Sequence, residues 1–346
     1  MWLPKGFCAP VELGRGGEAR TLLCWQDDPG RWVVLKIGTL SRTACLKREA
    51  QILQQLAGGP VPALLGQDLT GRHPWLALTW IDGIPLDALP ESLSIEDRKS
   101  ILLQASLAAA RLHGARMVHA DMSASNLIAR PHGEVGVVDF GLSPFPASTE
   151  IPSIEGAWDV LPPERLRGEA PDPRWDVFAL GVIGARLLGA IPPSVGSRDE
   201  WTDFVVSGEA AKCARGRSWG LSQALDPDPA VRPADAAALV RSLEREWGDP
   251  PFARARFATE NARRLEALFA TGVRTAASGG DWASAWRLQR ERIERATDPE
   301  PLLAQLGEYQ RLWRNPPGRA KFWIAAGAAG LVGAAILGWK FSRTPE

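Results

Sequence analysis

The stretch from 119 to 141, HADMSASNLIARPHGEVGVVDFG, constrains this chain more than any other part of it. It places Asp121 and, five residues later, Asn126 in one short loop, and Asp139 follows an alternating apolar segment as part of Asp-Phe-Gly. Phosphoryl transfer uses such a set, because one carboxylate deprotonates the attacking hydroxyl while a second carboxylate and an amide oxygen hold magnesium. If any one of these residues is considered alone, the alternative interpretation is a polar turn between a helix and a hairpin, without a catalytic role.

The order and spacing of these residues resemble the catalytic loop and the Asp-Phe-Gly motif of the protein kinase superfamily. The resemblance implies that Asp121 is the catalytic base and that Asn126 and Asp139 are ligands of Mg2+. It also implies that His119 packs beneath Asp139 and does not react. The expected fold is α+β, a two-lobed protein-kinase-like fold with a small antiparallel β lobe followed by a large helical lobe.

Three strands are expected between residues 10 and 37, at 11–17, 21–25 and 32–37. The turn after the first strand is rich in glycine, and glycines let a backbone fold tightly over phosphate oxygens and present its N–H groups to them. An ordinary hairpin turn is the alternative. The resemblance makes this turn the ATP-binding loop and makes Lys36 a catalytic residue on the nucleotide phosphates; the glycines concerned are Gly14, Gly16 and Gly17.

Glu49 lies in the helical run 44–56, and the resemblance implies that it pairs with Lys36. A solvated helix face is the alternative for Glu49, because Lys47 and Arg48 beside it are also charged. The apolar strand 75–83 runs into a glycine and resembles the hinge between the kinase lobes, where Leu78 would be the gatekeeper. Backbone groups of Thr79 and Ile81 are then expected to bind the adenine.

The end of the segment 139–164 resembles the end of the kinase activation segment, and Arg232 in Asp-Pro-Asp-Pro-Ala-Val-Arg-Pro is expected to pair with Glu164. Asp176 opens the helix 176–188 and is expected to be structural, either as a helix N-cap or as the residue that holds the catalytic-loop backbone. Four positions depart from the family pattern. Ala19 replaces the third glycine of the ATP-binding loop, Ala120 and Ser123 replace an arginine and a lysine, and Ala157 replaces a threonine. With Ala120 we expect activity to be independent of a phosphorylation switch, and the changes at Ser123 and Ala157 put the usual substrate geometry in doubt.

Lysine plus arginine equal aspartate plus glutamate at 40 each, so bulk charge does not argue for a nucleic-acid partner. Four cysteines form no CxxC pair and no zinc spacing with the four histidines, which favours reduced thiols in a cytosolic domain. The first residues carry no apolar run of signal-peptide length, so we expect the first domain not to be secreted.

After residue 249, apolar and aromatic residues recur at helical spacing, and breaks at 279–281 and 298–301 predict about three helices. Their aromatic residues are expected to form a core, with a binding groove as the alternative. Residues 322–339 carry no charge and are flanked by Lys321 and Lys340, which predicts one transmembrane helix at the C-terminus; a buried soluble helix is the alternative. More basic residues precede this run than follow it, which favours a cytoplasmic N-terminal side.

We therefore predict a membrane-anchored kinase that transfers the γ-phosphate of ATP to serine or threonine hydroxyls of a protein substrate and uses Mg2+. It would be a single-pass, tail-anchored protein of the cytoplasmic (inner) membrane, resembling bacterial-type serine/threonine protein kinases with such an anchor. A homodimer through the transmembrane helix or the kinase domain is allowed. A kinase of a small-molecule or lipid-linked substrate, favoured by Ser123 and Ala157, and a pseudokinase scaffold are the alternatives. The expected segments are 1–9 (N-terminal), 10–248 (kinase-like, with lobes 10–83 and 84–248), 249–315 (helical), 316–321 (linker), 322–339 (transmembrane) and 340–346 (tail).

Overall fold

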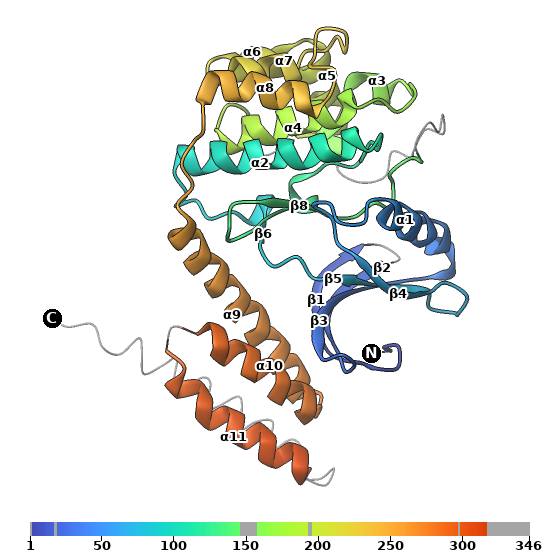
Figure 1. Ribbon diagram of the computed structural model, residues 1–346, viewed down its shortest axis with the longest axis vertical. Coiled ribbons are helices and arrows are strands. Elements are labelled where there is room, and N and C mark those ends of the chain that lie inside the picture. The colour runs from blue at the N-terminus through green and yellow to red at the C-terminus, as the bar shows by residue number, and fades with distance from the viewer. Residues whose placement is uncertain (1, 17–18, 146–157, 193–195, 297, 317–346) are drawn as a thin grey trace, which may run out of the picture. The chain divides into compact units, whose positions relative to one another are not determined.

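A computed structural model describes residues 2–16, 19–145, 158–192, 196–296 and 298–316 of the chain (Figure 1). The predicted α+β class is confirmed, because antiparallel strands precede a region built mainly from helices. The chain divides into two compact units, and each is described by itself. One unit combines residues 1–37 with the residues from 259 onward, and the other comprises residues 38–258.

The first unit begins with the three predicted strands, β1 (Phe7–Gly16), β2 (Ala19–Gln26) and β3 (Arg31–Gly38), which are neighbours in that order. β1 and β2 form an antiparallel hairpin whose last paired residues are Gly16 and Ala19. Gly14 and Gly16 of the predicted glycine-rich turn therefore belong to the paired part of this hairpin. The strands begin earlier than predicted at both β1 and β2, because polar residues such as Arg20 still pair across the ladder.

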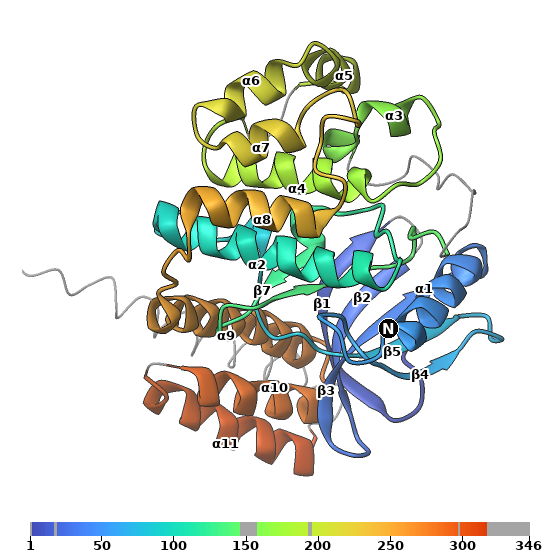
Figure 2. The same cartoon turned by 45° about the horizontal axis from the view of Figure 1, so that its top comes forward.

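The three predicted helices of the C-terminal region are α9 (Arg254–Ser278), α10 (Trp282–Arg295) and α11 (Glu300–Arg314). In both views α10 lies between α9 and α11 (Figures 1 and 2). Their aromatic residues form a core, as expected: Phe269 is fully buried, and Trp282 stacks on Tyr309 with ring centroids 6.3 Å apart. Phe269 also meets Trp32 of β3 edge to face, at 5.2 Å between centroids. The helices thus share a core with the first strands.

The second unit begins with α1 (Thr43–Gln55) and the antiparallel pair β4 (Leu64–Asp68) and β5 (Trp75–Thr79). A small antiparallel sheet follows, in the order β6 (Ile84–Pro85), β7 (Leu127–Ala129) and β8 (Val135–Val137). This small sheet positions the predicted catalytic residues, because Asn126 directly precedes β7 and Asp139 follows shortly after β8.

The helical part of the second unit is organised around α2 (Ile95–Gly114), α4 (Arg174–Leu187) and α8 (Ala236–Trp247), which pack on one another (Figure 1). α2 begins at Ile95 because Ser94 and Asp97 form a reciprocal capping box at its N-terminus. The added Cβ of an alanine at Gly184 would overlap Leu102, so glycine permits the close approach of α4 to α2. Shorter helices complete the unit: α3 (Pro163–Leu166), α5 (Arg198–Val206), α6 (Glu209–Arg215) and α7 (Trp219–Ala224).

None of the helices in the described part of the chain has an apolar span sufficient to cross a membrane. The predicted transmembrane segment 322–339 lies outside the described residues, as do the tail and Ala157.

Candidate active site

The loop that carries Asp121 is anchored through two consecutive backbone amides. The N–H groups of His119 and Ala120 donate to the two carboxylate oxygens of Asp176, at 2.7 and 2.9 Å. Asp176 lies in the first turn of α4 and is 1% exposed. The structural role expected for Asp176 is confirmed: it holds the backbone of the loop that carries Asp121. It is not the N-cap of α4, since no side-chain hydrogen bond caps this helix.

A third donor to Asp176 is the ring of His113, at the end of α2. The backbone N–H of Ala236 donates to Nδ1 of this ring at 3.0 Å, so Nδ1 is an acceptor and the proton lies on Nε2. Nε2 then donates to Oδ2 of Asp176 at 3.0 Å. Burial acts to raise the pKa of Asp176, but the hydrogen bonds that its carboxylate accepts from the ring of His113 and from the backbone N–H of His119 outweigh it and hold the pKa below 3.8.

His119 is fully buried and holds the loop against the segment that follows β8. Its Nδ1 accepts from the N–H of Asp121 at 3.3 Å, and its Nε2 therefore donates to the carbonyl of Val138 at 3.1 Å. The ring also meets Phe140 edge to face at 4.8 Å. Both ring nitrogens are used within the protein, which fits the architectural role expected for His119.

Asp121 and Asn126 are hydrogen-bonded to each other. Nδ2 of Asn126 donates to the carbonyl of Asp121 at 2.9 Å and to its carboxylate at 3.3 Å. Because these acceptors take the amide nitrogen, Oδ1 of Asn126 points away from Asp121 and is the atom suited to a cation. Burial raises the pKa of the Asp121 carboxyl, and the charge of Asp139 raises it further, while His119, Arg165 and Asn126 act in the opposite direction.

Asp139 has a left-handed backbone with φ of +70°, a conformation that L-residues other than glycine seldom adopt. Its Oδ1 accepts from the N–H of Gly141 at 3.5 Å, and its side chain is exposed. Phe140 is buried, and its N–H donates to Oε1 of Glu49 at 3.4 Å. Glu49 on α1 is itself only 1% exposed, so the solvated-face alternative is wrong; its pairing with Lys36 stays a prediction.

The donor set fits a magnesium ion better than a transition metal. Asp139 and Asn126 offer a carboxylate and an amide oxygen, which are hard ligands of the kind Mg2+ binds together with substrate phosphates. Among the described residues, no group of three or more His, Cys, Asp or Glu side chains gathers as a metal site. The two-ligand set is therefore suited to a cation that arrives with a phosphate ligand.

The predicted nucleotide-binding residues are distributed over both units. Gly14 and Gly16 lie on β1, Gly17 lies outside the described residues, and Lys36 is half-buried on β3. In the second unit Thr79 ends β5, and its N–H donates to the carbonyl of Ala63 at 2.9 Å, so this N–H is engaged within the protein. Ile81, two residues after Thr79, is half-buried.

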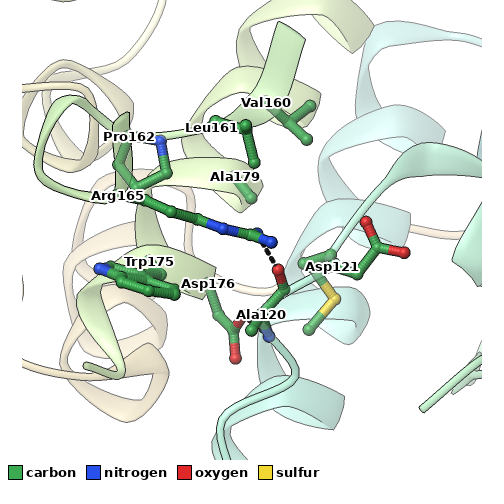
Figure 3. Close-up of a pocket in the computed structure, with 10 residues that line it drawn as sticks. Ala120, Asp121, Val160, Leu161, Pro162, Arg165, Trp175, Asp176 and Ala179 are labelled. Atoms are coloured by element: carbon green, nitrogen blue, oxygen red, sulfur yellow. Dashed lines mark hydrogen bonds between the residues drawn. The ribbon is translucent and has the colours of Figure 1, made fainter. Parts of the chain in front are cut away.

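Arg165 is a member of the site that sequence reasoning missed. It lies on α3, is 2% exposed, and its Nη1 donates to the carbonyl of Ala120 (Figure 3). The guanidinium lies 5.2 Å from the ring centroid of Trp175. Burial lowers the pKa of Arg165, while Asp121 and Asp176 act to raise it. No sequence signal indicated this contact, because Arg165 is one arginine among several in a polar segment.

The predicted pair of Glu164 and Arg232 is confirmed. Nη1 and Nη2 of Arg232 donate to the two carboxylate oxygens of Glu164 at 2.6 and 3.0 Å, and both side chains are buried. Ser123, at a position where the resemblance expects lysine, is also buried, and its Oγ lies 2.9 Å from Oγ of Ser125.

Comparison with known proteins agrees with this geometry. A family model described as "Protein kinase domain" matches residues 9–236, about two thirds of the chain. Aurora kinase A-B of Xenopus laevis is 30% identical over 202 residues, which cover 56% of this chain and 50% of that protein. Serine/threonine-protein kinase PknL of Mycobacterium tuberculosis is 32% identical over 158 residues, or 43% and 39% of the two chains. The chain thus spans half or less of the length of these relatives.

Proposed function

This chain belongs to the protein kinase domain family, and we propose that it transfers the γ-phosphate of ATP to serine or threonine hydroxyls of a protein substrate. The observation that carries the proposal is the joint placement of Asp121 and Asn126. The carboxylate of Asp121 is held by Nδ2 of Asn126, on a loop whose backbone is fixed by the buried Asp176. The names of similar serine/threonine kinases support the choice of acceptor.

In the proposed reaction Asp121 orients the substrate hydroxyl and accepts its proton, because it is the carboxylate that lies beside Asn126 on the anchored loop. Asp139 and Oδ1 of Asn126 would hold magnesium, and the bound cation would supply positive charge to neutralise the charge that develops on the transferred phosphate. The ATP phosphates are bound by Lys36, which has Glu49 as its partner, and by the glycine-rich turn. The adenine is bound by backbone groups of Thr79 and Ile81. His119 and Asp176 keep the loop in place throughout.

The class of substrate can be tested with labelled ATP. The protein is incubated with Mg2+, γ-labelled ATP and a generic protein substrate, and the labelled amino acids are identified after hydrolysis. We expect label on serine or threonine, a loss of this label in Asp121→Asn, and full activity in Asp203→Asn, which changes an exposed carboxylate on α5. Label on tyrosine, or label that persists in Asp121→Asn, would contradict the proposal.

A second candidate, a kinase of a small-molecule or lipid-linked substrate, is favoured by Ser123. Its buried hydroxyl is engaged with Ser125 where a lysine would reach the transferred phosphate. ATP consumption that depends on Asp121 and leaves all protein substrates unlabelled would favour this candidate. A pseudokinase would show no consumption of ATP in either assay.

We also propose, from the sequence alone, that residues 322–339 anchor the chain in the cytoplasmic membrane with the kinase domain in the cytoplasm. Membrane fractionation of the full chain, beside a chain that ends at residue 316, tests this. We expect the full chain in the membrane fraction after a carbonate wash and the shorter chain in the supernatant. A full chain that remains in the supernatant would rule out the anchor.

A further inference from the structure

We propose that Arg165 is a positioning residue that ties α3, at the end of the segment 139–164, to the loop that carries Asp121. The inference rests on the proposed function of the site and adds to it a residue that no motif indicates. The contact that carries it is the hydrogen bond from Nη1 of Arg165 to the carbonyl oxygen of Ala120, which is the peptide oxygen directly before Asp121 (Figure 3).

The side chain of Arg165 is buried, and its guanidinium packs against an aromatic ring. It is 2% exposed, and Trp175, which is equally buried, provides the surface over which the guanidinium lies at 5.2 Å. A buried cation requires anionic or carbonyl partners to offset its desolvation. Asp121 and Asp176 supply the negative charge that favours the guanidinium at this place. The contact is therefore built by several elements and is not a chance approach of a long side chain.

A hydrogen bond to the carbonyl of Ala120 acts on Asp121 through the peptide group that joins the two residues. Ala120 adopts a left-handed backbone with φ of +60°, which is unfavourable for alanine and persists only where neighbouring contacts hold it. Its N–H donates to Oδ1 of Asp176 at 2.9 Å, and its carbonyl accepts from Arg165. With both peptide groups of Ala120 engaged, the direction in which the chain enters Asp121 is determined by α4 on one side and α3 on the other.

The side chain at position 120 is a methyl group, so residue 120 itself contributes no charge here, and the guanidinium comes from position 165. Any movement of α3 that withdraws Arg165 would release the Ala120 carbonyl and let the loop relax. The position of α3 is therefore coupled to the orientation of the Asp121 side chain, and this coupling requires no phosphate group.

The test uses the full chain and four variants. Arg165→Met removes the charge and the donors, Arg165→Gln keeps an amide donor without the charge, and Arg165→Lys keeps the charge with a donor. Arg167→Met is the matched control, because Arg167 lies in the same segment but is exposed and pairs with the exposed Glu169, at 2.8 Å. Circular dichroism and thermal unfolding show which variants are folded.

The first measurement is independent of catalysis. Amide hydrogen exchange, followed by mass spectrometry, is compared for the peptide that covers residues 117–127 and for peptides from α2 and α8. We expect exchange on the order of tenfold faster in the 117–127 peptide of Arg165→Met, with α2 and α8 unchanged, because the change is a local opening. Arg165→Lys and Arg167→Met should exchange like the wild type. Equal exchange in folded Arg165→Met and wild type would overturn the proposal.

The second measurement is steady-state kinetics with saturating protein substrate. We expect kcat to fall on the order of 10- to 100-fold in Arg165→Met, since misplacing a catalytic group by about 1 Å has an effect of that order. KM for ATP should stay within about twofold, and Arg165→Lys should recover most of kcat. An unchanged kcat, or an equal loss in Arg167→Met, counts against Arg165. If Arg165→Met does not fold, the Lys variant must exceed the Gln variant in kcat; equality contradicts the proposal. If no variant transfers phosphate, the proposed function fails and the exchange data still decide on Arg165.

Discussion

The carboxylate of Glu164 and the guanidinium of Arg232 form a two-point pair, with Nη1–Oε1 at 2.6 Å and Nη2–Oε2 at 3.0 Å. The side chains are 4% and 0% exposed, so water does not screen this pair. Nε of Arg232 also donates to the carbonyl of Asp226 at 2.6 Å, and the guanidinium lies over Phe178. The pair thus connects α3, α4 and the segment before α8 within the second unit.

Removing one member of this pair should destabilise the protein strongly. Glu164→Ala leaves a buried guanidinium without its carboxylate, and we expect the free energy of unfolding to fall by about 3–5 kcal/mol. Urea denaturation at pH 7 measures this change. Glu169→Ala, which breaks an exposed pair in the same segment, should change stability by less than about 1 kcal/mol. A loss of similar size in both variants would contradict this assignment.

Asp139 should be required for the magnesium-dependent binding of ATP. In the wild type, ATP at about 100 times its Kd should raise the free energy of unfolding by about 2.7 kcal/mol, and chelation of magnesium should remove most of this gain. In Asp139→Asn we expect little gain with or without magnesium, since the neutral amide is a poorer ligand for the cation. Thermal-shift measurements check this, and a full magnesium-dependent shift in Asp139→Asn would exclude it as a ligand.

The buried Asp176 should contribute to the acid sensitivity of the protein. Burial opposes ionisation, but the hydrogen bonds from the ring of His113 and the backbone N–H of His119 hold the folded-state pKa below 3.8, the value in an unfolded chain. Its contribution to stability is therefore present above pH 3.8 and is lost as the pH falls through the lower, folded-state value. Urea titrations between pH 6 and pH 2 should show a shallower acid-side slope for Asp176→Asn than for the wild type. Parallel slopes would show that Asp176 does not contribute.

A chain that ends at residue 248, the predicted end of the kinase-like segment, should be poorly stable. It would lose the Ser284 hydroxyl that accepts from the N–H of Ala9 at 3.0 Å, and it would lose the contact of Phe269 with Trp32. Burial of a large apolar side chain contributes about 1.5–3 kcal/mol, so several such losses exceed the stability of many domains. We expect the shorter chain to aggregate on gel filtration.

The appropriate reference is a chain that ends at residue 316, which keeps α9, α10 and α11. It should elute as a single folded species and unfold cooperatively. Equal unfolding midpoints for the two truncated chains would show that the helices are dispensable for the strands.

Local order was well predicted from the sequence. The three first strands, the helix that carries Glu49 and the three C-terminal helices lie where hydrophobic periodicity and turn residues placed them. Periodicity does not determine a helix end such as the N-terminus of α2, where Ser94 and Asp97 form a capping box, because a cap depends on two side chains. The pair of Glu164 and Arg232 was also expected correctly, from the resemblance of both segments to the family.

The sequence by itself determined which chemical groups the segment from His119 to Asp139 contains and in what order. It also determined that Asp121 and Asn126 lie near each other, because residues a few positions apart cannot be separated far in space. Only the tertiary structure decided that Arg165 reaches the Ala120 carbonyl, that Glu49 meets the N–H of Phe140, and that the C-terminal helices share a core with β1–β3. The physical reason is that an apolar helix face or a single arginine has the same local signature whatever covers it. Its partner is selected by the packing of segments distant in the chain.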